Sequence, residues 1–177
     1  MRTRVLFQDE ARFGRISDRR RCWGPRPQRS VVGQQVIRES VYSLAAICPA
    51  DGQMATLVMP TADAEIMSLF LRHTAEVFAG DYCLMFLDGA GWHLARELDI
   101  PPTIRLLCLP PYSPELNPVE VLWKHLRENY FGNRVMTSLD EVEDRLCQAW
   151  HDLIQHPETV QSFAEFQWIK TICLTAN

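Results

Sequence analysis

The sequence predicts an α/β fold in which a mixed five-stranded sheet has helices on both faces. Strand-like segments without helical periodicity fill the first 60 residues, and short apolar runs alternate with helical patterns in the rest. At 177 residues and 47% apolar content, the chain is long enough for one full hydrophobic core. Residues 1–177 are therefore expected to form a single domain.

Three strands are predicted in the first part of the chain. In residues 4–14, alternation places Val5, Phe7 and Asp9 on one face of a strand and Glu10 on the other. The remaining predicted elements of this part are a loop or hairpin arm rich in Arg, Pro and Gly at 16–30, and two strands joined by a hairpin turn at 34–49 and 53–60.

Helices and apolar strands alternate in the second part. An amphipathic helix begins at Thr61 or Asp63, and apolar runs without alternation predict strands that are covered on both faces. A capping-box pattern, Ser138 followed by Glu141, begins the last helix. The predicted elements are a helix at 61–78, a strand at 82–88, a short helix at 93–99, a strand at 103–110, a helix from 117 and a helix at 138–154.

The ribonuclease H-like fold has this order of elements, with the first strand central and beside the fourth. No apolar run reaches membrane-spanning length, and the N-terminus lacks the apolar core of a signal peptide. The six cysteines are scattered without a CxxC pair, which argues against a zinc site and indicates reduced core thiols. We therefore expect a cytoplasmic protein with no membrane partner.

Charge is distributed unevenly along the chain. The formal net charge is −4, yet residues 1–42 hold ten arginines against four acids, and the remainder holds eight basic and eighteen acidic residues. Such segregation is compatible with a phosphate-facing patch near the N-terminus and equally with a solvated, arginine-rich loop.

Two aspartates lie at positions where a metal site is expected. Asp9 is on the apolar face of the first strand, where an ionised group is costly unless it is paired. Asp88 ends the fourth strand, and ligands bind outside the carboxyl ends of such strands. If the two strands are neighbours, the carboxylates meet and repel each other without a cation, for which Mg²⁺ or Mn²⁺ is suited. Each aspartate alone is more often structural.

Glu120 has two readings. In the segment NPVE, Asn117 is a good N-cap and Glu120 falls at the third helical position, where a capping-box glutamate belongs. Glu120 also shares a helix face with Lys124 and Arg127, an arrangement that fits a metal ligand beside phosphate contacts.

Three segments, FQDEARFG, LDGAGWH and PPYSPELNPVEVLW, occur in this order and resemble the catalytic blocks of DDE transposases. The similarity covers about residues 4 to 150 and is greatest to the bacterial insertion-sequence branch related to mariner elements. The resemblance implies that Asp9, Asp88 and Glu120 form the catalytic, metal-binding triad. Two features depart from the family pattern: only 31 residues separate Asp88 from Glu120, and Gly89 replaces a common asparagine.

The resemblance also implies the reaction and its partners. Two Mg²⁺ or Mn²⁺ ions would support DNA cleavage and strand transfer in insertion-sequence transposition, a form of recombination, with transposon ends and target DNA as partners. The family's helix-turn-helix DNA-binding region is expected to be absent, which leaves open a separately encoded one, as well as a homodimer. The protein would associate with the bacterial nucleoid when bound to DNA. The candidate DNA contacts are Arg12, Arg15, Arg19, Arg20, Arg21, Trp23, His93, Lys124 and Arg127.

Some alternatives remain at this level. His93 at a helix start is more often structural, and Trp23 either contacts DNA or packs the arm. The enzymatic rival is a ribonuclease H-like nuclease without strand transfer. The other rival is an inactive transposase remnant that keeps only the fold and DNA binding.

Overall fold

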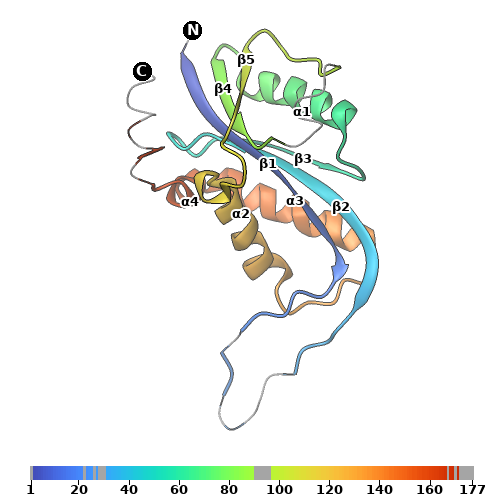
Figure 1. Ribbon diagram of the computed structural model, residues 1–177. Helices are drawn as coiled ribbons and strands as arrows, with labels where there is room; N and C mark the ends of the chain where they lie inside the picture. The colour runs from blue at the N-terminus through green and yellow to red at the C-terminus, as the bar shows by residue number, and fades with distance from the viewer. Residues whose placement is uncertain are drawn as a thin grey trace.

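The computed structural model describes residues 2–21, 23–25, 27, 31–89, 97–166, 168–169 and 171. Five strands form one sheet in the order β3-β2-β1-β4-β5 (Figure 1). They are β1 (Thr3–Ile16), β2 (Val36–Ile47), β3 (Met54–Met59), β4 (Tyr82–Leu87) and β5 (Ile104–Cys108). The first three strands form an antiparallel meander, whereas β4 pairs parallel to β1 and β5 parallel to β4. The mixed sheet expected of a ribonuclease H-like fold is confirmed, with β1 central and beside β4.

Helices cover both faces of this sheet. On one face lies α1 (Ala64–Val77); on the other lie α2 (Val119–Leu126), α3 (Leu139–Gln155) and α4 (Pro157–Phe163) (Figure 1). Two of them begin as their sequences predict. The Asp63 carboxylate accepts a hydrogen bond from the amide of Ile66, and the Ser138 hydroxyl accepts one from the amide of Glu141. Two short segments flank α2, namely η2 (Pro114–Leu116) and η3 (Arg127–Phe131).

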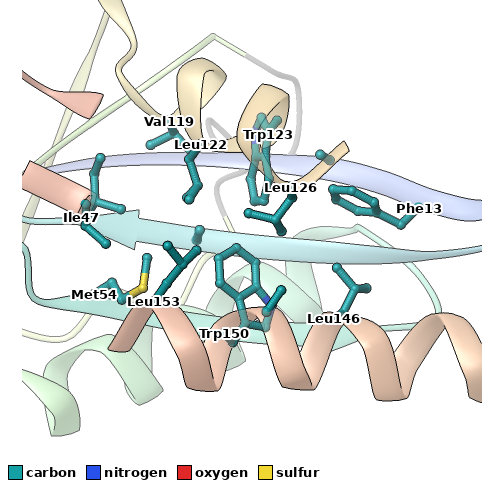
Figure 2. Close-up of a cluster of buried hydrophobic side chains, with 14 of the residues drawn as sticks. Phe13, Ile47, Met54, Val119, Leu122, Trp123, Leu126, Leu146, Trp150 and Leu153 are labelled. Atoms are coloured by element: carbon teal, nitrogen blue, oxygen red, sulfur yellow. The ribbon is translucent and has the colours of Figure 1, made fainter. Parts of the chain in front are cut away.

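The alternation along β1 divides the core into two clusters. Phe7 and Phe13 face α2 and α3, and Leu6 faces α1 on the other side. Figure 2 shows the first cluster, in which Trp123 of α2 and Trp150 of α3 have ring centroids 5.9 Å apart. Each fully buried side chain of this size contributes about 1.5–3 kcal/mol, which fixes α2 firmly on the central strand.

Two predicted strands are less covered than expected. In β4, Cys83, Met85 and Leu87 are buried on the α1 side, but the residues between them are only partly buried. β5 is an edge strand in which Arg105 and Cys108 are exposed. The expectation of burial on both faces was wrong because α2 and α3 pack over β1 and β2, leaving the β5 edge uncovered.

The described thiols match the prediction of core thiols only in part. Cys48 and Cys83 are buried, whereas Cys108 and Cys147 are exposed. Most of the short helix predicted at 93–99 lies outside the described residues. Within the described part of the chain, no helix is long and apolar enough to cross a membrane.

The described parts of the connection between β1 and β2, here called the arm, extend from the body of the molecule (Figure 1). At its base, the amide of Ser17 donates to the carbonyl of Gln35 over 3.0 Å, and the Gln35 amide donates to the Ser17 hydroxyl. A further bond joins the arm to the segment after α2, because the Arg20 amide donates to Asn133 Oδ1 over 2.9 Å.

Candidate active site

Asp9 and Asp88 come from neighbouring parallel strands. Phe7 of β1 is paired with Phe86 of β4. Asp9 lies two positions after Phe7, and Asp88 lies two positions after Phe86. Asp88 directly follows the last residue of β4 and is exposed, while Asp9 continues along β1 and is partly buried. The parallel pairing thus brings both aspartates to the carboxyl end of β4, as predicted from the strand order.

Asn117 attaches the start of α2 to the strand that carries Asp9. Its Nδ2 donates to the main-chain carbonyl of Gln8 over 2.9 Å, and its Oδ1 accepts from the amide of Val119 over 3.2 Å. Asn117 is only 5% exposed, so both bonds are shielded from water. One side chain therefore connects β1 at Gln8, next to Asp9, with the first turn of the helix that carries Glu120.

The capping-box reading of Glu120 was wrong. The amide of Asn117, which a capping-box glutamate would bind, instead donates to the carbonyl of Pro114 over 3.0 Å. The helix begins at Val119, and the exposed Glu120 carboxylate accepts no hydrogen bond from the described residues. The Glu120 amide donates to the Asn117 carbonyl over 3.1 Å. This amide at the start of the helix therefore has a partner without any contribution from the Glu120 side chain.

Asp9, Asp88 and Glu120 border one open cavity of about 430 Å³. The cavity has two kinds of lining, or wall, because the loop that leads from β5 to α2 supplies a mainly apolar part beside the acids. That part is lined by Leu109, Pro110, Pro111, Tyr112, Ser113 and Pro114. In the described part of the chain, no three His, Cys, Asp or Glu side chains are close enough together to hold a metal ion. The three carboxylates surround a common space without forming a closed ligand set.

The electrostatics of Asp9 are governed by burial and by neighbouring acids. The pKa of Asp9 is raised to about 7, chiefly by burial and also by the negative charges of Glu120 and Glu10, against the hydrogen bond from Trp123, which lowers it. A divalent cation in the cavity would offset these effects, and carboxylate oxygens are the donors that Mg²⁺ and Mn²⁺ prefer. The residues present therefore fit such a metal.

Trp123 is a part of the site that the sequence analysis missed. Its Nε1–H donates to Asp9 Oδ2 over 2.9 Å, although the indole itself is 1% exposed and packed in the core. The available signal was its position three residues after Glu120 on an amphipathic helix, since a buried tryptophan usually needs a partner for its N–H. The hydrogen bond between Trp123 and Asp9 fixes the orientation of the Asp9 carboxylate.

Of the predicted DNA contacts, Arg12 and Arg127 lie together. Both border a surface depression of about 270 Å³, and the Arg127 guanidinium lies 5.4 Å from the centre of the Phe13 ring. Arg12 is exposed, as is Lys124, which is one turn before Arg127 on the face of α2 that also carries Glu120. A line of basic side chains therefore leads away from the cavity along α2.

The remaining predicted arginines divide into two groups. Arg15 donates to the carbonyl of Met136 and pairs with Glu39 at 2.6 Å, while Arg20 pairs with Asp18 at 2.7 Å. These two side chains have structural partners that the sequence did not reveal. Arg19 and Arg21 are exposed, and Trp23 is fully exposed, so it does not pack against the arm. His93 lies outside the described residues.

Comparison with known proteins finds a relative of substantial sequence identity. The uncharacterised protein y4pE/y4sA of Sinorhizobium fredii is 38% identical over 131 residues, which are 72% of this chain and 95% of that protein.

Solved structures of the Mos1 transposase have the same fold. The paired-end complex with the left transposon end matches with a TM-score of 0.61 and 16% identity, over 92% of this chain and 56% of the Mos1 chain. The mariner Mos1 paired-end complex with Mn matches at 0.59 with 15% identity, over 90% and 54%. The chain therefore spans about half the length of the Mos1 chains that it matches.

The family model of the DDE superfamily endonucleases matches residues 4–143. This match includes the whole sheet, the loop that borders the cavity, helix α2 and the beginning of α3. Because it extends over well more than half of the sequence, the resemblance in the three sequence blocks is confirmed, and the chain belongs to the DDE superfamily endonucleases.

Proposed function

We propose that this protein is a transposase catalytic domain that cleaves DNA and joins its ends to target DNA during insertion-sequence transposition. The observation that carries the proposal is the shared cavity of Asp9, Asp88 and Glu120, three acids from segments far apart in the sequence. Membership in an endonuclease family and the fold shared with Mos1 transposase complexes support it. The protein would act in the cytoplasm, on the DNA of the nucleoid.

In this proposal, the three carboxylates hold two divalent cations, Mg²⁺ or Mn²⁺. When bound, these ions polarise the phosphate and lower the pKa of the attacking water or DNA 3′-hydroxyl. Solved Mos1 complexes with Mn and with Mg support this choice of metal. No side chain needs to act as a nucleophile.

The residues of the chain position these ligands. Trp123 orients Asp9 by its hydrogen bond to Oδ2. Asn117 fixes the start of α2 against β1 and so sets the distance from Glu120 to Asp9. Asp88 is at a strand end, where a side chain is displayed without crossing the core. The exposed Lys124 and Arg12 and the partly buried Arg127 would then hold the DNA backbone beside the cavity.

Two assays test this function. A supercoiled plasmid reports Mg²⁺-dependent nicking, and a duplex with a free 3′-hydroxyl, incubated with the plasmid as target, reports joining. We expect both activities from the wild-type chain and neither from Asp88→Asn or Glu120→Gln. Because Glu120 accepts no hydrogen bond from the described residues, Glu120→Gln should leave the free energy of unfolding within about 0.5 kcal/mol of wild type in EDTA.

The outcomes separate the proposal from its rivals. Nicking without joining would assign a ribonuclease H-like nuclease instead of a transposase. DNA binding without either reaction would assign an inactive remnant. Nicking that survives Glu120→Gln would remove Glu120 from the triad.

A further inference from the structure

Tyr112 is held in an unusual conformation at the rim of the cavity. Its φ angle is 57°, in the left-handed region that bulky side chains rarely adopt. Its side chain is 102% exposed, so the ring makes no packing contact that would compensate for this backbone. Yet it borders the same cavity as the three acids.

Stability alone does not explain a tyrosine at this position. Glycine or asparagine adopts positive φ more easily, and either would suit the turn better than an exposed aromatic ring. Pro111 before it and Pro114 after it restrict the backbone of the loop, so the strained residue is held in place by its neighbours. Strained residues displayed at a cavity in this way are typical of ligand contacts.

The two walls of the cavity match the two parts of a nucleotide. The acidic wall suits a phosphate bound through cations, while the wall from Leu109 to Pro114 carries no charged side chain. The faces of a nucleobase are apolar and stack on aromatic side chains with little regard to sequence. A tyrosine between the prolines is the aromatic group that this wall presents.

We propose that Tyr112 is a substrate-positioning residue that stacks on an unpaired nucleobase next to the scissile phosphate. This inference rests on the proposed function, because it takes the acidic wall to be the site of the phosphate. The stacked base would fix the position of the strand end relative to Asp9, Asp88 and Glu120. The substrate class is then DNA with an unpaired or easily opened base at the cleavage position.

Four proteins that differ only at position 112 distinguish the effect of the aromatic ring from the effect of the backbone strain. Wild-type Tyr112 and Tyr112→Phe keep the ring and the strain. Tyr112→Asn and Tyr112→Gly lose the ring but tolerate positive φ. The probe is a duplex with a short unpaired 3′ extension that carries 2-aminopurine, a base whose fluorescence falls when it stacks. Binding is measured in Ca²⁺, so that a cation offsets the acidic wall.

We expect DNA binding and thermal stability to change in opposite directions. Tyr112→Asn and Tyr112→Gly should weaken binding about 5- to 150-fold and abolish the fluorescence quench. Tyr112→Gly should also raise the Tm by about 2–4 °C, because the strain is relieved. Tyr112→Phe should match wild type in both measurements, and 2-aminopurine at a paired position should respond equally to all four proteins.

Equal binding and quenching by all four proteins would overturn the inference. A change in oligomeric state among the variants, with DNA binding unchanged, would also overturn it and assign Tyr112 to a protein contact. Mg²⁺-dependent nicking by the wild-type chain is measured in parallel. Its absence would count against the proposed function, whereas the quench by itself tests the contact with the base.

Discussion

Asp9 shows what the fold does to a single carboxylate. The residue continues the apolar face of β1, so its side chain points toward the core beneath α2. Burial raises the pKa of Asp9 to about 7 from an ordinary value of 3.8. The folded protein therefore keeps a proton on Asp9 in a pH range where the unfolded chain has already released it.

The first prediction is a pH-dependent instability of the metal-free protein. Between pH 4 and 7 the unfolded chain binds fewer protons at Asp9 than the folded chain, so the free energy of unfolding falls as the pH rises through this window. Asp9→Asn should remove the fall, because the amide is neutral and still accepts from Trp123. We expect Asp9→Asn to stabilise the protein by about 1–3 kcal/mol at pH 8 in EDTA and to have little effect at pH 4.

Urea unfolding at several pH values measures this difference. Mg²⁺ should stabilise the wild-type protein at pH 8 and have a smaller effect on Asp9→Asn, since the substitution removes a ligand. A wild-type stability that stays level between pH 4 and 7 would contradict the raised pKa.

The second prediction concerns the indole N–H groups of the core. Trp123 donates to Asp9, whereas the Nε1 of the neighbouring Trp150 is buried without a partner in the described part of the chain. Trp123→Phe and Trp150→Phe remove similar volumes from one cluster, so they form a matched pair. Loss of the bond to Asp9 should lower Mn²⁺ affinity and DNA cleavage about 10- to 100-fold in Trp123→Phe only.

Electron paramagnetic resonance of free Mn²⁺ gives the affinity without relying on activity, and thermal melts confirm that both variants are folded at the assay temperature. If both variants lose affinity equally, core packing rather than the hydrogen bond to Asp9 is responsible.

At the scale of elements, the start of α2 is fixed by tertiary hydrogen bonds. The helix itself has only eight residues, too few to be stable alone, and it depends on packing and on its first turn. Asn117 supplies that attachment through one donor and one acceptor, and the prolines before it limit the path of the loop. The position of Glu120 therefore depends on a residue that is three positions away.

The third prediction compares two side chains at helix starts, Asn117 before α2 and Ser138 before α3. Asn117→Ala should lower the free energy of unfolding by about 2–3 kcal/mol, because two buried groups lose their partner, and should also lower cleavage by misplacing Glu120. Ser138→Ala removes the cap of α3, far along the chain from the cavity-lining loop, and should cost about 0.5–2 kcal/mol without loss of activity.

Both variants are assayed at a temperature at which urea titrations show them folded. Full cleavage by folded Asn117→Ala would mean that the attachment to Gln8 stabilises the protein without positioning Glu120.

At the scale of the whole molecule, the protein has a net negative charge but also a group of neighbouring basic side chains, here called the basic path. The net charge is −4, but Arg12 and Arg127 border one surface depression, and the exposed Lys124 lies on α2 one turn before Arg127. The sequence predicted contacts throughout the arginine-rich arm. Arg15 instead pairs with Glu39 and donates to the carbonyl of Met136, and Arg20 pairs with Asp18 within the arm, which makes both weaker candidates for DNA.

The fourth prediction is that phosphate contacts follow this path. Arg12→Ala or Lys124→Ala should weaken binding to every duplex similarly and reduce the slope of log K against log salt by about 1 each. Arg72→Ala is the matched control: it removes one exposed positive charge from α1, on the opposite face, and should leave the slope unchanged. Fluorescence anisotropy at several salt concentrations measures all three. An equal effect of Arg72→Ala would mean that net charge rather than position governs binding.

Local patterns were sufficient to predict the elements and much of the sheet. The alternation of Val5, Phe7 and Asp9 predicted which face of β1 is buried, and the caps at Asp63 and Ser138 are where the sequence places them. The same reasoning failed for β5, whose apolar run suggests a covered strand. Coverage depends on which helices lie above it, and that is decided by packing elsewhere in the molecule.

The sequence by itself determined the order of the five strands and of the helices α1 to α3, the family and the three acids that were proposed as a triad, because periodicity and short motifs are local properties of the chain. The tertiary structure decided how those acids are held. The Trp123–Asp9 bond joins residues 114 positions apart, and the Asn117–Gln8 bond joins residues 109 positions apart. It also decided that Glu120 is not a cap, because Asn117 finds its partners in β1 and η2. Hydrogen bonds of such long range exist only once the sheet and α2 have packed, so no pattern within one segment specifies them.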